Sequence, residues 1–346
     1  MRNFIIRRLF QAFILLFFIS ALIYFILNLV PGGPFDLLKT SNPRVTQDHI
    51  NRLNALLGLN QPWYERYFIW LGNLAQGNWS NSWTVSAGRP VAELIMNRLP
   101  YTVLLMGLSL IISIIVAVPI GVYSAVKQYS WADYLVTGLS FFGASMPTFF
   151  FGILMIVIFA VGLGWFPAAG GVAAPGLPGN IVDVLRRTFS LGATNPELAG
   201  REFEIFIDGL KHLVMPATVL SLFNLAGFSR FVRSSMLEVL KQDYMRTARA
   251  KGVAERVVIL KHGLRNALIP VVTIIMLSIP GLFAGAIVTE TIFSWPGMGR
   301  LFLDGIAQVD WSLVQGILVI EAFLVVSCNL LADIMYAVID PRIQYG

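Results

Sequence analysis

Long apolar stretches dominate this chain and restrict it to a small set of folds. A helix needs about 20 apolar residues to cross a bilayer, because each residue advances it by about 1.5 Å. Six stretches approach or exceed that length, at residues 9–30, 100–124, 134–163, 212–230, 267–290 and 312–337. Within hydrocarbon the backbone must satisfy its own polar groups, which a helix does. The sequence therefore predicts an all-α integral membrane protein with six transmembrane helices.

The composition supports this class and excludes others. Of the 346 residues, 56% are hydrophobic and only 13% are charged, which does not suit a soluble domain. The net charge of +6 lies beside the apolar stretches, so it indicates membrane orientation and contact with anionic lipid, not nucleic-acid binding. One cysteine, Cys328, allows no intrachain disulfide and no Cys-based zinc site. The three histidines, His49, His212 and His262, are far apart in the predicted topology, so we expect no metal site.

A basic segment predicts which side of the membrane the loops occupy. Residues 230–265 contain nine Lys and Arg residues and three acidic residues, a net charge of +6. Basic loops stay in the cytoplasm, and Arg2, Arg7 and Arg8 place the N-terminus there too. With six spans, both termini are expected in the cytoplasm of a multi-pass protein. A topology anchor without further function is the alternative for this segment.

The topology divides the chain into three predicted parts. Residues 1–30 hold the N-terminus and the first, uncleaved span, and residues 31–98 form an external region with a helical stretch near 46–77. Residues 99–346 form a core with five spans and a cytoplasmic loop at 231–266. In the core, the Gly/Pro-rich residues 164–179 are expected to form an irregular external loop.

Signatures of catalysis are missing. The chain has no Gly-x-x-x-x-Gly-Lys-Ser/Thr loop, no Gly-x-Ser-x-Gly elbow and no His-Glu-x-x-His motif. Work against a gradient therefore needs a partner or an ion. Two carboxylates of the last span, Glu321 and Asp333, are candidates for a pore-lining or a helix-pairing role, since ionisable groups are costly in a bilayer.

The basic loop contains a short predicted helix. Asp243 is expected to cap its start and Gly252 to stop it. Tyr244, Met245, Ala248 and Gly252 share one side of this helix, and Asp243, Arg246, Thr247 and Arg249 share the other. Small residues allow close approach, which suits docking into a groove of a partner. A helix lying on lipid headgroups is the alternative.

At these residues the sequence resembles a known family. The stretch from Asp243 to Gly252, continued by Lys261 to Pro270, is similar to the coupling motif of bacterial binding-protein-dependent ABC importer permeases, in the dipeptide/oligopeptide/nickel branch. Against the general motif, Arg246-Thr247-Ala248 replaces Glu-Ala-Ala. Further matching pieces are Leu29–Pro34, Leu57–Pro62, Arg89–Val91, Arg98–Pro100, Ser145–Phe149, Leu163–Pro167, Ser294–Arg300 and Asp340–Ile343. An external insertion near 171–206 departs from the pattern.

The resemblance implies a six-helix permease of type I ABC importer architecture in a bacterial or archaeal cytoplasmic membrane. It implies a homologous second permease, two P-loop ATPases that carry ATP and Mg, and an external solute-binding protein. The chain itself would be no enzyme and hold no cofactor. The residues implied in ATPase coupling are Asp243, Tyr244, Arg246, Thr247, Ala248, Arg249, Lys251 and Gly252.

The implied cargo is di- or oligopeptides. Nickel chelates or oligosaccharides on the same machinery are alternatives. Two other classes stay open on the residues alone. One is a stand-alone channel or secondary transporter, and the other is a membrane enzyme using external residues such as Trp79, Trp83, Asp183 or Glu197.

Overall fold

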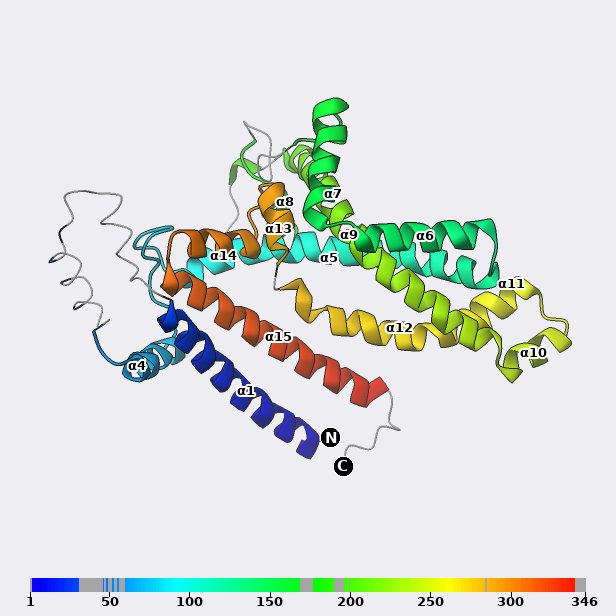
Figure 1. Ribbon diagram of the computed structural model, residues 1–346, viewed down its shortest axis with the longest axis horizontal. Coiled ribbons are helices and arrows are strands. Elements are labelled where there is room, and N and C mark those ends of the chain that lie inside the picture. The colour runs from blue at the N-terminus through cyan, green and yellow to red at the C-terminus, as the bar shows by residue number, and fades with distance from the viewer. Residues whose placement is uncertain are drawn as a thin grey trace. The chain divides into compact units, whose positions relative to one another are not determined.

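The computed structural model describes residues 2–30, 46, 48, 52, 55, 60–168, 177–189, 196–198, 200–283 and 285–339. In these ranges the chain is helical, with one isolated antiparallel bridge between Asn81 and Pro90. Figure 1 shows the helices in order. Several expectations lie outside the described residues: most of the helical stretch predicted before residue 60, much of the insertion near 171–206, and the motif at 340–343.

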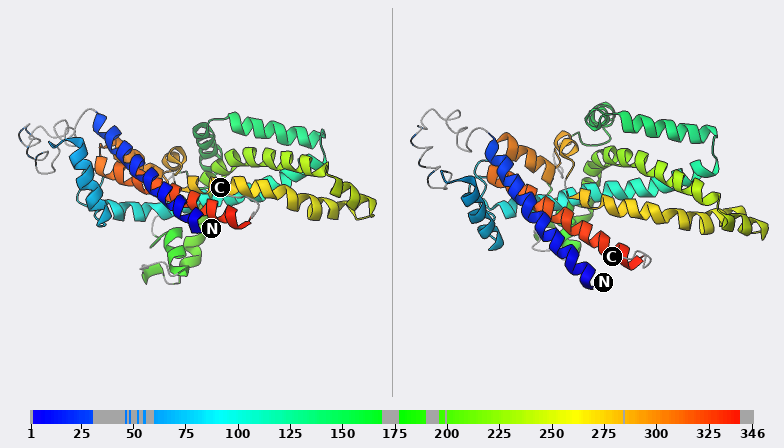
Figure 2. Two further views of the ribbon diagram at one scale, coloured as in Figure 1. Left: turned by 90° about the horizontal axis from the view of Figure 1, so that it is seen from below. Right: turned by 60° about the horizontal axis from the view of Figure 1, so that its bottom comes forward.

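The chain divides into two compact units. One comprises Met1–Pro100 with Gly297–Gly346, and the other comprises Tyr101–Pro296. The first contains helices from both ends of the sequence: α1 (Arg2–Leu29), α4 (Trp63–Ala75), the start of α5 (Val91–Val126), α14 (Met298–Ala307) and α15 (Trp311–Ile339). Helix α1 lies along α15 in every view (Figures 1 and 2).

The helices of this first unit pack through small and aromatic residues. Tyr67 of α4 is buried against α1, where its hydroxyl shares a hydrogen bond of 2.9 Å with Ser20. The Tyr24 ring of α1 packs edge-on against it, with ring centroids 5.6 Å apart. Gly316 of α15 has no side chain, which admits Val91 at the start of α5. The later part of the helical stretch expected near 46–77 is thus α4, which packs on α1.

The second unit is built around α9 (Glu202–Leu240). Its other elements are the rest of α5, α6 (Trp131–Ser145), α7 (Thr148–Met155), η1 (Ile156–Gly162), α8 (Ile181–Thr188), η2 (Pro196–Leu198), α10 (Asp243–Ala250), α11 (Glu255–Val257), η3 (Val258–Leu264), α12 (Arg265–Ser278), η4 (Pro280–Leu282) and α13 (Ile287–Ile292). Helices α6 and α12 both contact α9. At the crossing with α5, Gly121 lets Val232 of α9 approach its backbone.

Five helical stretches of the described residues are long and apolar enough to cross a membrane: Ile6–Leu29, Val91–Val126, Glu202–Leu240, Glu255–Leu282 and Trp311–Asp333. The expected count of six spanning helices is therefore not confirmed, although the all-α membrane class is. The third expected span, 134–163, is divided into α6, α7 and η1. The fifth begins earlier than expected, at Glu255, and ends before residue 290.

The division of the third span has a local cause. A residue before proline avoids the helical region, because its backbone would collide with the proline ring. Met146 accordingly has an extended backbone (φ −81°, ψ 126°), and α7 begins directly after Pro147. Figure 1 shows α6 and α7 running in different directions. Pro147 therefore separates two helices within the stretch expected to be one span.

Candidate coupling site

The predicted short helix exists as α10, between the end of α9 and the start of α11. It covers Asp243–Ala250, with Lys251 at its C-cap position and Gly252 directly after. The predicted cap is wrong: Gln242 occupies the N-cap position with an extended backbone, and Asp243 is the first helical residue. An acidic residue there still stabilises the helix, because the first turn carries a partial positive charge.

Gly252 ends the helix as predicted. Its φ of +75° lies in the left-handed region, which glycine adopts without a steric cost. Its N–H donates to the Arg249 carbonyl (2.9 Å), and the Val253 N–H donates to the Ala248 carbonyl (3.3 Å). This pair of bonds is a Schellman motif, which satisfies the last carbonyls of the helix.

One methionine attaches α10 to the rest of the unit. Met245 is fully buried, and it is the one buried residue of this helix. A Cβ added at Gly263 of η3 would lie 3.2 Å from Met245 Cε and 3.5 Å from Met236 Cε. The close-packed glycine of the region is therefore Gly263. At Gly252, no described atom lies within 4 Å of an added Cβ.

The opposite side of α10 is polar and exposed. Arg246 and Asp243 are the most exposed, at 75% and 97% of their side chains, and they lie 3.7 Å apart. Ala248 is half-buried, and the other predicted coupling residues are exposed: Tyr244, Thr247, Arg249, Lys251 and Gly252. The structure therefore places all eight predicted residues in one short segment, with Met245 as its anchor.

Two side-chain bonds hold this exposed segment to the next helices. Arg249 donates to both carboxylate oxygens of Glu255 across the Gly252 turn, at 2.9 Å (Nη2 to Oε1) and 3.1 Å (Nε to Oε2). These hydrogen bonds raise the pKa of the Arg249 guanidinium above its ordinary value, so it stays charged. The Tyr244 hydroxyl accepts from Asn266 Nδ2 at 3.1 Å, which joins α10 to the first turn of α12.

A buried ion pair braces the helix that leads into the site. Arg233 of α9 donates through Nε and Nη2 to the two oxygens of Asp133, both at 2.9 Å. Asp133 is buried in the first turn of α6 and also accepts from the Ser124 hydroxyl and the Tyr129 N–H. Sequence reasoning did not predict this ion pair. Ser130 followed by Asp133 is the spacing of a helix N-cap and its third residue, and it could have placed Asp133 in a first helical turn. In the structure the Ser130 side chain caps α6 and accepts from the Asp133 N–H.

The two predicted carboxylates of α15 have different surroundings. Asp333 forms an ion pair with Arg8 of α1 (3.0 Å) inside the first unit. This contact favours helix pairing over pore lining for Asp333. Glu321 is half-buried. Sequence reasoning also passed over Glu290, which is fully buried and accepts from the Thr102 hydroxyl at 2.9 Å.

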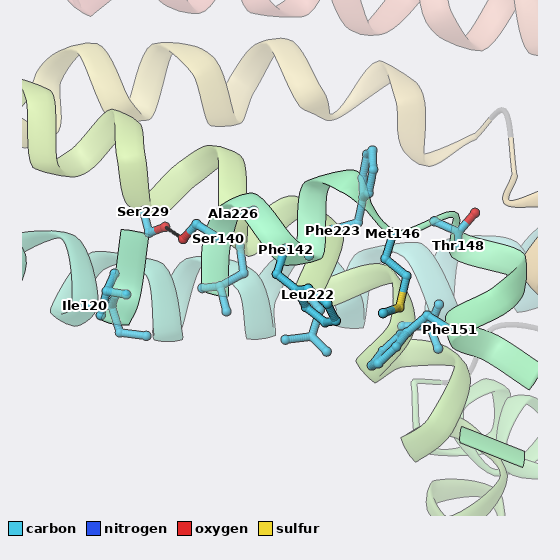
Figure 3. Close-up of a pocket in the computed structure, with 14 residues that line it drawn as sticks. Ile120, Ser140, Phe142, Met146, Thr148, Phe151, Leu222, Phe223, Ala226 and Ser229 are labelled. Carbon is cyan, nitrogen blue, oxygen red and sulfur yellow. Dashed lines mark hydrogen bonds between the residues drawn. The ribbon is translucent and has the colours of Figure 1, made fainter. Parts of the chain in front are cut away.

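The break between α6 and α7 opens an apolar pocket in the second unit. It has a volume of about 300 Å³ and is lined by α5, α6, α7 and α9. Figure 3 shows a serine pair, Ser140 and Ser229, at one end, with their hydroxyl oxygens 3.4 Å apart. Met146 and Phe151 lie at the other end (Figure 3). The pocket is thus mainly apolar, with one pair of hydroxyl groups at one end.

No group of three or more His, Cys, Asp and Glu side chains in the described part of the chain is placed to hold a metal ion. The several helices that are long and apolar enough to cross a membrane define a multi-pass membrane protein, in which a short basic helix, α10, lies between two of these helices. The chain belongs to the family described as binding-protein-dependent transport system inner membrane component, which matches residues 117–345. Residues 1–106 match the N-terminal component of the same transport systems.

Full-length relatives agree with this family. The chain is 44% identical over 345 residues to the oligopeptide transport system permease protein AppB of Bacillus subtilis, covering 100% of each chain. It is 38% identical over 346 residues to the di/tripeptide transport system permease protein DppB of Pseudomonas aeruginosa, covering 100% of this chain and 99% of the relative. It is 34% identical over 345 residues to the glutathione transport system permease protein GsiC of Escherichia coli K12, covering 100% of each. This chain is thus a membrane-embedded ABC importer permease and a transport subunit, not an enzyme.

Proposed function

We propose that this permease forms half of a translocation pathway for di- or oligopeptides delivered by an external solute-binding protein. The names of its relatives support the cargo: oligopeptides for AppB, di- and tripeptides for DppB and glutathione for GsiC. All three are peptides, so the shared chemistry is a short peptide backbone. The other half of the pathway is a second, homologous permease.

The energy for transport comes from two P-loop ATPases on the cytoplasmic side, which hold ATP and Mg. The observation that carries this proposal is α10, with one buried anchor, Met245, and an exposed polar face. Such a helix suits a cleft on an ATPase surface. Arg246 makes a long, exposed ion pair with Asp243 (3.7 Å), which a partner carboxylate can replace, whereas Arg249 is held by shorter hydrogen bonds to Glu255 (2.9 Å).

Coupling of ATP hydrolysis to transport then requires that α10 contacts the ATPases differently in their open and closed states. As the ATPases close on ATP, they carry α10 with them, and the buried contact of Met245 with η3 and α9 passes that movement to the spans. The spans alternate between inward- and outward-facing arrangements, whose populations the ATPases shift. Removing the ATPases leaves nothing in this chain to drive the change.

Uptake into liposomes tests this function. The complete transporter, with its binding protein outside and ATP inside, is offered labelled dipeptides, longer peptides, a nickel chelate and an oligosaccharide. We expect uptake of peptides that requires both ATP and the binding protein. Uptake by the permease without ATPases would contradict the proposal and indicate a secondary transporter. ATP-driven uptake of the chelate or sugar alone would overturn the peptide assignment.

A further inference from the structure

A second pocket, in the first unit, has a chemistry that the transport function does not use. It has a volume of about 590 Å³ and lies between α1, α4, the loop before α5 and the start of α15. Three aromatic side chains line it, Tyr24, Trp70 and Trp83, together with the polar side chains of Arg66, Asn73 and Gln315. We call it the interface pocket.

Two buried nitrogen atoms of its lining have no hydrogen-bond partner among the described residues. One is Nε2 of Gln315, whose side chain belongs to a residue only 7% exposed, and the other is Nε of Arg66. A buried donor without an acceptor destabilises a protein, because the hydrogen bond that it made to water is not replaced. Both nitrogens are donors, so the missing partner is an acceptor.

The charge of the lining also favours an acceptor that carries negative charge. Arg66 is the one charged side chain that lines the pocket, and a second nitrogen of its guanidinium donates to the Asn28 amide oxygen. The nearest buried carboxylate, Asp310, is already satisfied. It accepts from the Ser82 hydroxyl and from four backbone N–H groups, those of residues 83–85 and 313. The pocket therefore presents to an anion the positive charge of Arg66 and two buried donors that have no acceptor among the described residues.

The surroundings of the pocket place it at the edge of the bilayer. Helix α1 has 28 residues and is about 42 Å long, so its Leu29 end reaches the headgroup region. The neighbouring surface is apolar and exposed: Ile26 and Leu29 on α1 are 50% and 64% exposed, and Phe68 and Ile69 on α4 are 60% and 55% exposed. Acyl chains would cover this surface, which adjoins the α1 and α4 walls of the pocket.

We propose that the interface pocket binds the phosphate-bearing headgroup of an anionic phospholipid, with its acyl chains on the exposed surface of α1 and α4. Arg66 and Gln315 donate to the phosphate, and the aromatic rings of Tyr24, Trp70 and Trp83 enclose the glycerol part. A bound lipid would hold α4 against α1 and α15. This site is separate from the coupling segment and does not depend on which cargo is carried.

Native mass spectrometry of the delipidated complete transporter tests the proposal. Phosphatidylglycerol or phosphatidylcholine with the same acyl chains is titrated back onto the wild type and onto three variants. Arg66→Gln removes the cation, and Gln315→Glu replaces the amide by an isosteric anion. Arg7→Gln is the matched control, because it removes one exposed arginine at the opposite end of α1.

We expect the wild type and Arg7→Gln to retain one phosphatidylglycerol per chain in preference to phosphatidylcholine. Each pocket variant should bind it at least roughly tenfold more weakly, as expected for one lost charge-assisted hydrogen bond. Undiminished retention in both pocket variants would overturn the site. If Gln315→Glu does not assemble, Arg66→Gln at the pocket rim decides the test alone.

Competition identifies the ligand class. Inorganic phosphate or glycerol phosphate that displaces the lipid at matched concentration would show a site for small anions, and a tripeptide that displaces it would show a peptide site. Either result overturns the lipid assignment. Resistance to all three competitors supports it. The assay needs no transport, so failure of the peptide-uptake experiment leaves it unaffected.

Discussion

The buried carboxylates of this chain each find their partners far away in the sequence. Asp133 is paired with Arg233, 100 residues later, and Asp310 holds the loop at residues 82–85. Glu290 accepts from Thr102, 188 residues earlier. Partners at such distances are invisible to local patterns, so sequence reasoning recognised Glu321 and Asp333 by their place in an apolar run and missed these three. Spacing predicts which face a residue occupies, but not what lies opposite.

The Asp133–Arg233 pair leads to a prediction at this scale. Arg233→Gln leaves a buried carboxylate without its cation, which should lower the free energy of unfolding by about 3–5 kcal/mol. The double variant Asp133→Asn/Arg233→Gln should be more stable than Arg233→Gln, because it buries no charge. Thermal unfolding of the purified protein measures both.

The control for this prediction is Arg246→Gln. Arg246 is 75% exposed, and we expect little change in melting temperature when it is replaced. A melting temperature of Arg233→Gln equal to that of the control would show that the buried pair does not stabilise the fold.

At the scale of elements, local rules predicted α10 well and the third span poorly. The stop at Gly252 needs only a residue that tolerates a positive φ, which the sequence shows directly. The division of 134–163 depends on whether a proline stays inside one continuous helix or separates two helices. Pro216 and Pro270 lie inside continuous helices, whereas Pro147 separates α6 from α7. The choice between these outcomes is made by neighbouring helices, which no local pattern contains.

The end of α10 gives the second prediction. Gly252→Val forces a β-branched residue into a backbone with φ +75°, at a cost of about 1–2 kcal/mol, and displaces the Arg249–Glu255 pair beside it. We expect ATP hydrolysis to continue while peptide uptake falls roughly tenfold, the factor that corresponds to such an energy. Uptake and hydrolysis are measured together in liposomes.

Gly200→Val is the matched control for this change. Gly200 has a φ of +84° and equally open surroundings, but it lies before α9, far along the chain from the coupling segment. We expect it to lose stability without separating hydrolysis from uptake. Normal uptake by Gly252→Val would remove α10 from the coupling mechanism.

For the whole molecule, hydropathy and charge predicted the class, and the third prediction concerns its orientation. After Cys328→Ser, single cysteines are placed at two exposed positions, Gln76 after α4 and Lys251 after α10. An impermeant maleimide should label Gln76→Cys from outside intact cells and Lys251→Cys only from the cytoplasmic side of inverted vesicles. The reverse labelling would place the basic loop outside and exclude its contact with cytoplasmic ATPases.

The anchor of α10 has a mechanical consequence. Met245, a side chain with three rotatable bonds, is the one buried residue of this helix and lies beside the glycine of η3. The other contacts of α10 with the following helices, the Arg249–Glu255 pair and the Tyr244–Asn266 hydrogen bond, are exposed, and exposed ion pairs contribute little free energy. If a partner docks on α10 as proposed, we therefore expect a translation of the helix to reach η3 through Met245, whereas a tilt strains mainly the exposed contacts.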